Sequence, residues 1–368
     1  MLRTVPGAKT VVCLAHPRQD LTHHPIVDEL LGRDHAVWTQ GTRSVNNDTT
    51  LVHEQALLDI AAGQEFLRKS GFDHVVTLGH SGGGPLFAYY QEQAARAPDD
   101  RVSRTPGGRP TGLAAATMPV PDAAVFLAPH PGQGALLMKM IDPSVSDESD
   151  PMSVVAELDP YHPDNGFAAP PQNSAFPAEF VARYRRAQRE RVARIDDRAR
   201  EFVAEAGPGR AAPDDVAGRR RALAPRLLIV YRTDADPACV DPSLDPNDRP
   251  YGSLFGPRPD LTNYGLAGFG RITTADAWLS TWSGLSTNAD FVRCAPGVRT
   301  PTLFVELTGD QACTPQEAET MFDALGAADK HHLRLRGTHF GAALTADEPT
   351  GITLAARAID DWLSDRFR

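Results

Sequence analysis

The chain has 368 residues, of which 41% are hydrophobic and 23% charged, and a formal net charge of −10 at pH 7. This length accommodates one large domain, or a core domain with an insertion, and the composition is typical of a globular protein. The acidic balance argues against nucleic acid as the main partner, because phosphate binding requires a basic surface.

The first 130 residues alternate between two hydrophobic patterns. Short runs of apolar residues predict buried strands at 10–15, 35–39, 74–78 and 122–128. Helical spacing of apolar residues predicts helices at 25–31, 51–68 and 85–97. Strands that alternate with helices indicate an α/β protein, with a mostly parallel sheet covered by helices on both faces.

The alternation of strands and helices stops near Gly132 and returns near Thr300. Between these points the chain has many prolines and few runs typical of buried strands. Beyond Thr300, strands are predicted at 302–307 and 332–335, and helices at 315–325 and 352–363. We therefore divide the chain into a first core segment at 1–132, an insertion at 133–296 and a second core segment at 297–368.

The insertion has its own predicted elements. A long, highly charged helix is expected from about Pro177 to Ala206, and the pair Gly207-Pro208 is expected to end it. The run at 226–231 predicts a strand. Trp278 and Trp282 lie in a later helical segment.

The sequence Gly79-His80-Ser81-Gly82-Gly83 fits the pattern G-x-S-x-G and lies between a predicted strand and a predicted helix. A sharp turn at this point lifts a serine hydroxyl above the edge of the sheet, and its crowded backbone requires glycine on either side. We therefore predict that Ser81 is a nucleophile and that the backbone N–H of Gly82 donates to an oxyanion. The alternative is a glycine-rich turn that merely joins a strand to a helix.

A serine nucleophile needs a base, and the base needs an orienting acid. Asp310 follows the predicted strand at 302–307, and His339 follows the one at 332–335. We predict Asp310 as the acid and His339 as the base; a turn aspartate and a structural histidine are the alternatives. Glu306 is a weaker rival for the acid, because it lies within its strand.

With these residues in the order Ser81, Asp310, His339, the chain resembles the α/β-hydrolase superfamily over about residues 9–130 and 298–366. The resemblance implies a mostly parallel, doubly wound sheet and a large, mainly helical cap formed by the insertion. It also implies a serine hydrolase that works through an acyl-enzyme, without a metal or an organic cofactor. Relatives usually have two antiparallel strands before the first strand seen here. Only about eight residues are available, so we expect a reduced sheet of about six strands.

The loop at 15–20 is the place where such relatives carry the second oxyanion donor. Pro17 stands where many of them have glycine, and proline has no N–H, so the backbone amide of Arg18 is the expected donor. The Arg18 guanidinium is also a candidate partner for a substrate carboxylate, although a solvated or ion-paired arginine is commoner. Candidate substrate-binding residues are His16, His80, His130, Trp278 and Trp282. Aromatic residues of an insertion more often form its own core.

Hydrolysis of a carboxylic ester or lactone of a small to medium organic molecule is the leading hypothesis. Cleavage of a C–C bond, a thioester or an amide, and acyl transfer, stay open because they use the same triad. A non-catalytic ligand-binding protein with a capped pocket is the alternative of another class. Dehalogenase and epoxide-hydrolase chemistry is disfavoured, because those relatives have an aspartate in the place of Ser81.

Aspartates and cysteines do not add a metal site to these expectations. The aspartates of the loop at 234–259 lack the central glycine and terminal glutamate of an EF-hand, which favours a solvated loop over a calcium site. The four cysteines include no closely spaced pair, so we expect reduced, mostly buried thiols in a cytoplasmic protein. A small molecule is the expected partner, rather than nucleic acid or a membrane, and a homo-oligomer stays open.

Overall fold

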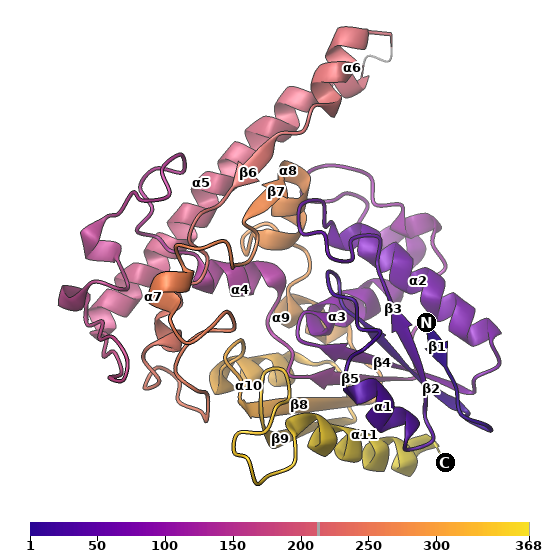
Figure 1. Ribbon diagram of the computed structural model, residues 1–368. Helices are drawn as coiled ribbons and strands as arrows, with labels where there is room; N and C mark the ends of the chain where they lie inside the picture. Colours follow the sequence, from indigo (N-terminus) through magenta and orange to yellow (C-terminus); the bar gives the residue numbers. More distant parts are fainter. Residues whose placement is uncertain (212–213, 368) are drawn as a thin grey trace.

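Seven β-strands form one mostly parallel sheet in the computed structural model, which describes residues 1–211 and 214–367 (Figure 1). Their order across the sheet is β1-β3-β2-β4-β5-β8-β9. The strands are β1 (Leu2–Arg3), β2 (Thr10–Ala15), β3 (Ala36–Gln40), β4 (His74–His80), β5 (Ala123–Leu127), β8 (Thr302–Gly309) and β9 (Lys330–Thr338). Every neighbouring pair is parallel except β1 and β3. This sheet and the helices around it confirm the predicted α/β fold class.

The expectation of about six strands was too low, because β1 adds a seventh. Leu2 and Arg3 pair antiparallel with Trp38 and Val37 at the edge of the sheet. A two-residue strand has no hydrophobic period of its own. It exists because the folded sheet presents an edge with unpaired backbone groups.

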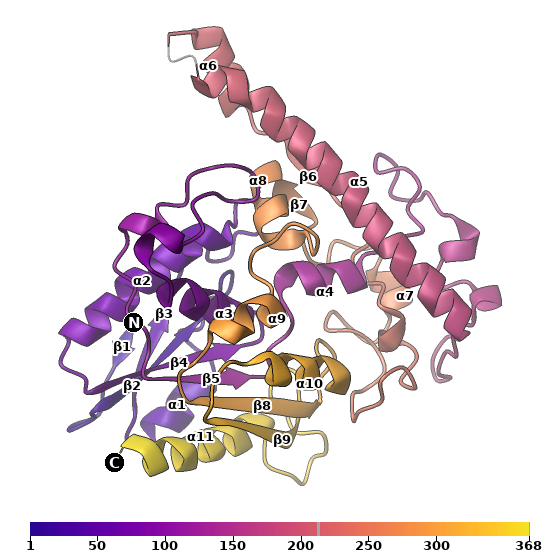
Figure 2. The same ribbon diagram turned by 180° about the vertical axis from the view of Figure 1, so that it is seen from behind.

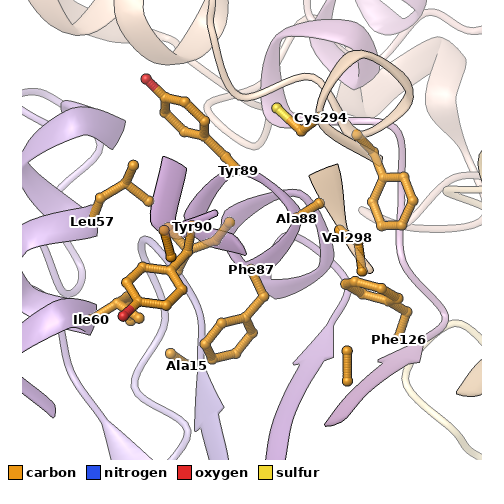
Figure 3. Packing of buried hydrophobic residues seen from close by; sticks show 14 of the residues in the cluster. Ala15, Leu57, Ile60, Phe87, Ala88, Tyr89, Tyr90, Phe126, Cys294 and Val298 are labelled. Carbon is orange, nitrogen blue, oxygen red and sulfur yellow. The ribbon is translucent and has the colours of Figure 1, made fainter. Parts of the chain in front are cut away.

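Helices cover both faces of the sheet, because successive residues of a buried strand point to opposite sides. On β2, Val11 and Cys13 pack in one cluster with α2 (His53–Lys69) and α3 (Gly83–Ala94). Val12 and Leu14 pack on the other side with α1 (Ile26–Leu31) and α11 (Gly351–Phe367). Figure 3 shows the first cluster, where Phe87 of α3 is fully buried. Burying such a side chain stabilises the fold by about 1.5–3 kcal/mol, so α3 is held firmly against the sheet.

The chain leaves the sheet after β5 and rejoins it at β8, where Val125 pairs with Leu303. The mainly helical segment between these strands, from α4 to α9, is called the cap below. Its elements are α4 (Gln133–Met140), α5 (Ala178–Ala211), α6 (Val216–Leu223), β6 (Leu227–Ile229), α7 (Pro259–Thr262), β7 (Ile272–Thr274), α8 (Ala275–Ala277), a π-helical turn (Trp278–Trp282) and α9 (Phe291–Cys294). The far end of α5 and the helix α6 project from the body as an arm (Figures 1 and 2). One more helix of the core, α10 (Pro315–Ala324), lies between β8 and β9 in the chain.

Two predictions for the cap were wrong in detail. Helix α5 continues beyond Gly207 to Ala211, because packing against α6 offsets the one backbone hydrogen bond that a proline removes. The predicted strand at 226–231 is the three-residue β6, which pairs antiparallel with β7 outside the main sheet. Leu228 is buried while both of its neighbours on β6 are exposed, so this run covers one small surface and does not lie inside the sheet.

Two further observations concern the helices and the cysteines. No helix among the described residues is long and apolar enough to cross a bilayer. The cysteines Cys13, Cys239, Cys294 and Cys313 are all buried and unpaired. Burial raises the pKa of Cys13 to about 12, which keeps this thiol protonated and unreactive at neutral pH.

Candidate active site

Ser81 lies on a strained turn between β4 and α3. Its φ of 54° falls in the left-handed region, which a residue with a side chain adopts only when the surrounding structure imposes it. A methyl group on Gly79 would lie 2.5 Å from the carbonyl oxygen of Gly83, and one on Gly83 would collide with the carbonyl oxygen of Ala15. The glycines of the motif are therefore required by close backbone approach, as the sequence pattern predicted.

Ser81, His339 and Asp310 come together at the ends of three strands. The Ser81 hydroxyl lies 2.9 Å from Nε2 of His339, whose Nδ1–H lies 2.9 Å from both carboxylate oxygens of Asp310. The backbone N–H groups of Ala312 and Cys313 also donate to Asp310 Oδ1, at 2.6 and 3.1 Å. This arrangement holds the imidazole with Nε2 free to accept a proton from the serine.

The rival acid Glu306 lies apart from these three residues. Its carboxylate accepts from Nε of Arg334 at 3.0 Å and lies 3.1 Å from Nε2 of His332. All three residues lie on β8 and β9, within the strands and before their carboxyl ends. Glu306 therefore forms an ion-paired cluster of the sheet.

His80 lies behind the group of three and does not line the cavity beside Ser81. Its Nε2–H donates to the backbone carbonyl of His339 at 3.0 Å, and its Nδ1 accepts from Nε2–H of His24 at 3.2 Å. Burial lowers the pKa of His80 well below its usual value and that of His24 to about 4, so both rings are neutral. The structure thus places His80 as a support for the His339 backbone.

A cavity of about 110 Å3 lies directly beside Ser81 and His339. The cap supplies its apolar wall, which consists of Leu136, Leu254, Phe255, Phe269 and Trp282, and Phe340 of the core completes that wall. His16, Arg18, Gln19, His130 and Gln133 form the polar side. Residues of the cap and residues of the core therefore line the cavity together, and Ser81 is one of them.

The two predicted tryptophans have different positions. Trp282 lines the cavity, whereas Trp278 is fully buried in the core of the cap, where its Nε1–H donates to Asp196 Oδ1 at 2.7 Å. The prediction that Trp278 binds substrate is therefore not supported by its placement. The two residues are four positions apart on a π-helical turn, and this widened turn directs them differently from an ordinary helix.

Arg18 is engaged in both its side chain and its backbone. Its Nε and Nη2 each donate to the Asp48 carboxylate at 2.6 Å, and its guanidinium carbon lies 5.6 Å from the Phe269 ring centroid. Its backbone N–H donates to Nδ1 of His16 at 3.1 Å. The expected oxyanion role of this amide was wrong, because the loop after Pro17 turns the amide toward the His16 ring.

His16 and His130 both carry their ring proton on Nε2. His16 Nδ1 accepts from the backbone N–H groups of Arg18 and Gln19, at 3.1 and 3.0 Å, and His130 Nδ1 accepts from that of Gly132 at 3.1 Å. Burial lowers the pKa of both rings well below the usual value, so neither is charged at neutral pH. Each ring therefore presents one N–H to the cavity.

Gln133 is a site residue that the sequence analysis missed. Its side-chain amide donates to the Gly82 carbonyl at 3.5 Å, and a methyl group added at Gly82 would collide with its Nε2. The available signal was its position directly after the loop that follows β5, because that loop lies at the same edge of the sheet as Ser81.

The aspartates of the loop at 234–259 serve local structure. Asp234 accepts from the hydroxyls of Ser253 and Thr262, and Asp236 accepts from Arg185 at 2.5 Å. Among the residues that the structure describes, no three His, Cys, Asp or Glu side chains are grouped as metal ligands would be.

No protein-family model matches the chain, and no curated protein matches its sequence. Many solved structures match its fold. DcsB, solved in complex with its substrate analogue, is 13% identical, with 99% of this chain and 92% of that chain covered and a TM-score of 0.51. A monoacylglycerol lipase from Paleococcus ferrophilus is 14% identical, with 99% and 97% covered and a TM-score of 0.43. At such low identity a likeness establishes a shared fold and leaves the reaction to be argued from the site.

Proposed function

The chain has the α/β-hydrolase fold, and we propose that it is a serine hydrolase that cleaves a carboxylic ester or lactone of a small to medium organic molecule. The observation that supports this most strongly is the unbroken contact from Ser81 Oγ through His339 to Asp310, with each distance at 2.9 Å. A strained serine, a histidine base and a buried carboxylate in this order are the parts that nucleophilic acyl transfer needs.

The proposed reaction has two halves. Ser81 Oγ attacks the carbonyl carbon while its proton moves to His339 Nε2, and the carbonyl electron pair moves onto oxygen. The intermediate then collapses, the C–O bond to the alcohol breaks, and the alcohol takes the proton from His339. Water repeats the sequence on the acyl-enzyme, releasing the acid and restoring Ser81. Asp310 stabilises the imidazolium that forms in each half.

The size and lining of the cavity favour a substrate whose acyl group is small and uncharged. Its volume of about 110 Å3 is below that of a cavity that holds benzene, about 150 Å3. The wall from the cap is apolar, and the Arg18 charge is already paired with Asp48. A longer or charged acyl group would have to displace cap residues or break that ion pair.

Labelling and turnover together test this function. A fluorophosphonate probe should modify wild-type protein at Ser81, and p-nitrophenyl esters with two to ten acyl carbons should be hydrolysed, fastest at the short end. Ser81→Ala should lose both activities, whereas the exposed Ser149→Ala should retain them. Wild-type protein that neither labels nor turns over any ester or lactone, while binding small molecules in the cavity, would instead indicate a non-catalytic binding protein. Preferential cleavage of thioesters, amides or C–C bonds would reassign the substrate and keep the triad.

A further inference from the structure

The tetrahedral intermediate of the proposed reaction needs hydrogen-bond donors around its oxygen. The Gly82 backbone, at the N-terminal end of α3 and next to Ser81, is one source. The loop after β2 is the expected second source, but Pro17 has no N–H. The next two amides, those of Arg18 and Gln19, both donate to the ring of His16. Backbone donors of this loop are thus used within the loop itself.

The His16 ring itself can donate a hydrogen bond into the cavity in place of these backbone amides. Because two backbone N–H groups point at Nδ1, the ring must hold its proton on Nε2, at the opposite side. His130 repeats the arrangement, with the Gly132 amide on its Nδ1. Two imidazoles from separate loops, one after β2 and one after β5, therefore present the same kind of donor.

Both donors converge beside the nucleophile. A methyl group on Gly82 would lie 2.7 Å from His16 Nε2 and 3.2 Å from His130 Nε2. Both rings are nearly fully buried, at 3% exposure, and both line the cavity that contains Ser81. Within the described part of the chain, no protein group accepts a hydrogen bond from either Nε2. Because both rings line the cavity and their Nε2–H groups have no described protein acceptor, these donors are available to an oxygen of a bound substrate.

We propose that His16 and His130 donate from Nε2–H to the oxygen of the tetrahedral intermediate, together with the Gly82 amide. These two side chains then take the part that the Arg18 amide was expected to play. The inference rests on the proposed serine hydrolase function, because it concerns the same reacting carbonyl. The two rings are neutral donors set before the reaction, so they add no charge that would disfavour protonation of His339 during attack.

Gln133 completes the support of this region. Its amide donates to the Gly82 carbonyl, on the other side of the same glycine. His53 is fully buried, and burial lowers the pKa of its ring to about 4. The glycine is therefore surrounded by side-chain nitrogens, and any residue larger than glycine at 82 would displace them.

The test replaces each donor with an isosteric ring that cannot donate and with an amide that can. His16→Phe and His130→Phe should each lower kcat/KM for p-nitrophenyl butyrate by about 10²–10³-fold, the usual effect of losing one oxyanion donor. KM should change little, and the Ki of a trifluoromethyl ketone, which forms a tetrahedral adduct, should rise by a similar factor. His16→Gln and His130→Gln should recover part of the rate. The exposed His331→Phe is the matched control and should behave as wild type.

A second measurement needs no variant and so does not depend on how the variants fold. In wild-type protein with 15N-labelled histidine, the Nε2–H resonances of His16 and His130 should move downfield when the trifluoromethyl ketone binds. Unchanged resonances, or unchanged kcat/KM in both folded Phe variants, would overturn the inference while Ser81 labelling stays intact. A wild type that is neither labelled by fluorophosphonate nor active overturns the proposed function, and the inference with it.

Discussion

His80 donates a hydrogen bond from Nε2–H to the backbone carbonyl of His339 at 3.0 Å. His80, which precedes Ser81 in the chain, thus anchors the backbone of His339, the residue that accepts the proton of Ser81. His24 fixes the orientation of the His80 ring by donating to its Nδ1 at 3.2 Å. Two hydrogen bonds therefore join the turn at Ser81 to the loop after β9: the one from His80 to the His339 carbonyl, and the one between Ser81 and His339, which are 258 positions apart.

His80→Phe should remove this support and lower kcat by about ten- to a hundredfold, since loss of a positioning contact has effects of this size. The ring keeps its volume, but His339 loses its backbone anchor. His80→Gln, whose amide can still donate, should retain most of the activity. Single-turnover acylation rates separate this effect from product release, and equal rates for His80→Phe and wild type would contradict the prediction.

Asp310→Asn should lower kcat by about 10⁴-fold, because an amide at this position favours the wrong tautomer of the base. Steady-state hydrolysis of a short ester measures the loss. Glu306→Gln is the matched control, because its carboxylate pairs with Arg334 and lies outside the site. A larger loss for Glu306→Gln than for Asp310→Asn would assign the acid to Glu306.

Gly79→Ala should destabilise the protein by about 1–3 kcal/mol, the cost of forcing atoms into a packed region. The added methyl would lie 2.5 Å from a backbone oxygen that cannot move aside as a flexible side chain does. Gly207→Ala, in helix α5, would meet no atom within 4 Å outside its chain neighbours and its own helix, so it should destabilise the protein much less than Gly79→Ala. Urea unfolding curves give both values, and a neutral Gly79→Ala would show that the turn relaxes.

Stability should fall as the pH is lowered from about 6.5 to about 4. Burial depresses the pKa of His24 and of His53 to about 4 in the folded protein, while the unfolded chain titrates near the ordinary histidine value. Above pH 6.5 neither state binds these protons, so the effect vanishes there. Between the two values the unfolded state holds more protons, and each histidine lowers the free energy of unfolding by about 1.4 kcal/mol per pH unit.

His24→Gln tests this pH dependence, because its amide can still donate to His80 but cannot titrate. The slope of the unfolding free energy against pH, measured with urea at several pH values, should decrease by about one proton between pH 6.5 and 4. An identical slope in the variant and the wild type would mean that His24 is protonated in the folded state as readily as in the unfolded one.

Trp282→Ala should widen the cavity and shift the preference among p-nitrophenyl esters toward longer acyl chains. The side chain lines the wall next to Phe269, with ring centroids 6.2 Å apart. Trp278→Phe is the control from the same π-helical turn. It should cost about 1–3 kcal/mol of stability by removing the indole donor from Asp196 Oδ1, and leave the chain-length profile unchanged. A shifted profile in both variants would indicate a general loosening of the cap.

Local patterns were sufficient to predict the central strands of the sheet, whereas its edge strands were predicted less well. β2 was predicted residue for residue at Thr10–Ala15, because every one of its positions is buried and the apolar run is continuous. β9 was predicted only at 332–335 but runs from Lys330 to Thr338. It is the edge strand of the sheet and mostly half-buried, and the charged or histidine residues on its exposed positions interrupt the hydrophobic pattern.

The sequence by itself determined the turn at Ser81 and the chain order of Asp310 and His339. These are local signals: glycines where the backbone is crowded, and polar residues directly after apolar strands. Tertiary structure alone decided that the Arg18 amide serves the His16 ring, that Trp282 and not Trp278 faces the cavity, and that His16 and His130 meet at Gly82. Each of these depends on which way a ring or an amide points once segments far apart in the chain are packed together, and no local pattern encodes that direction.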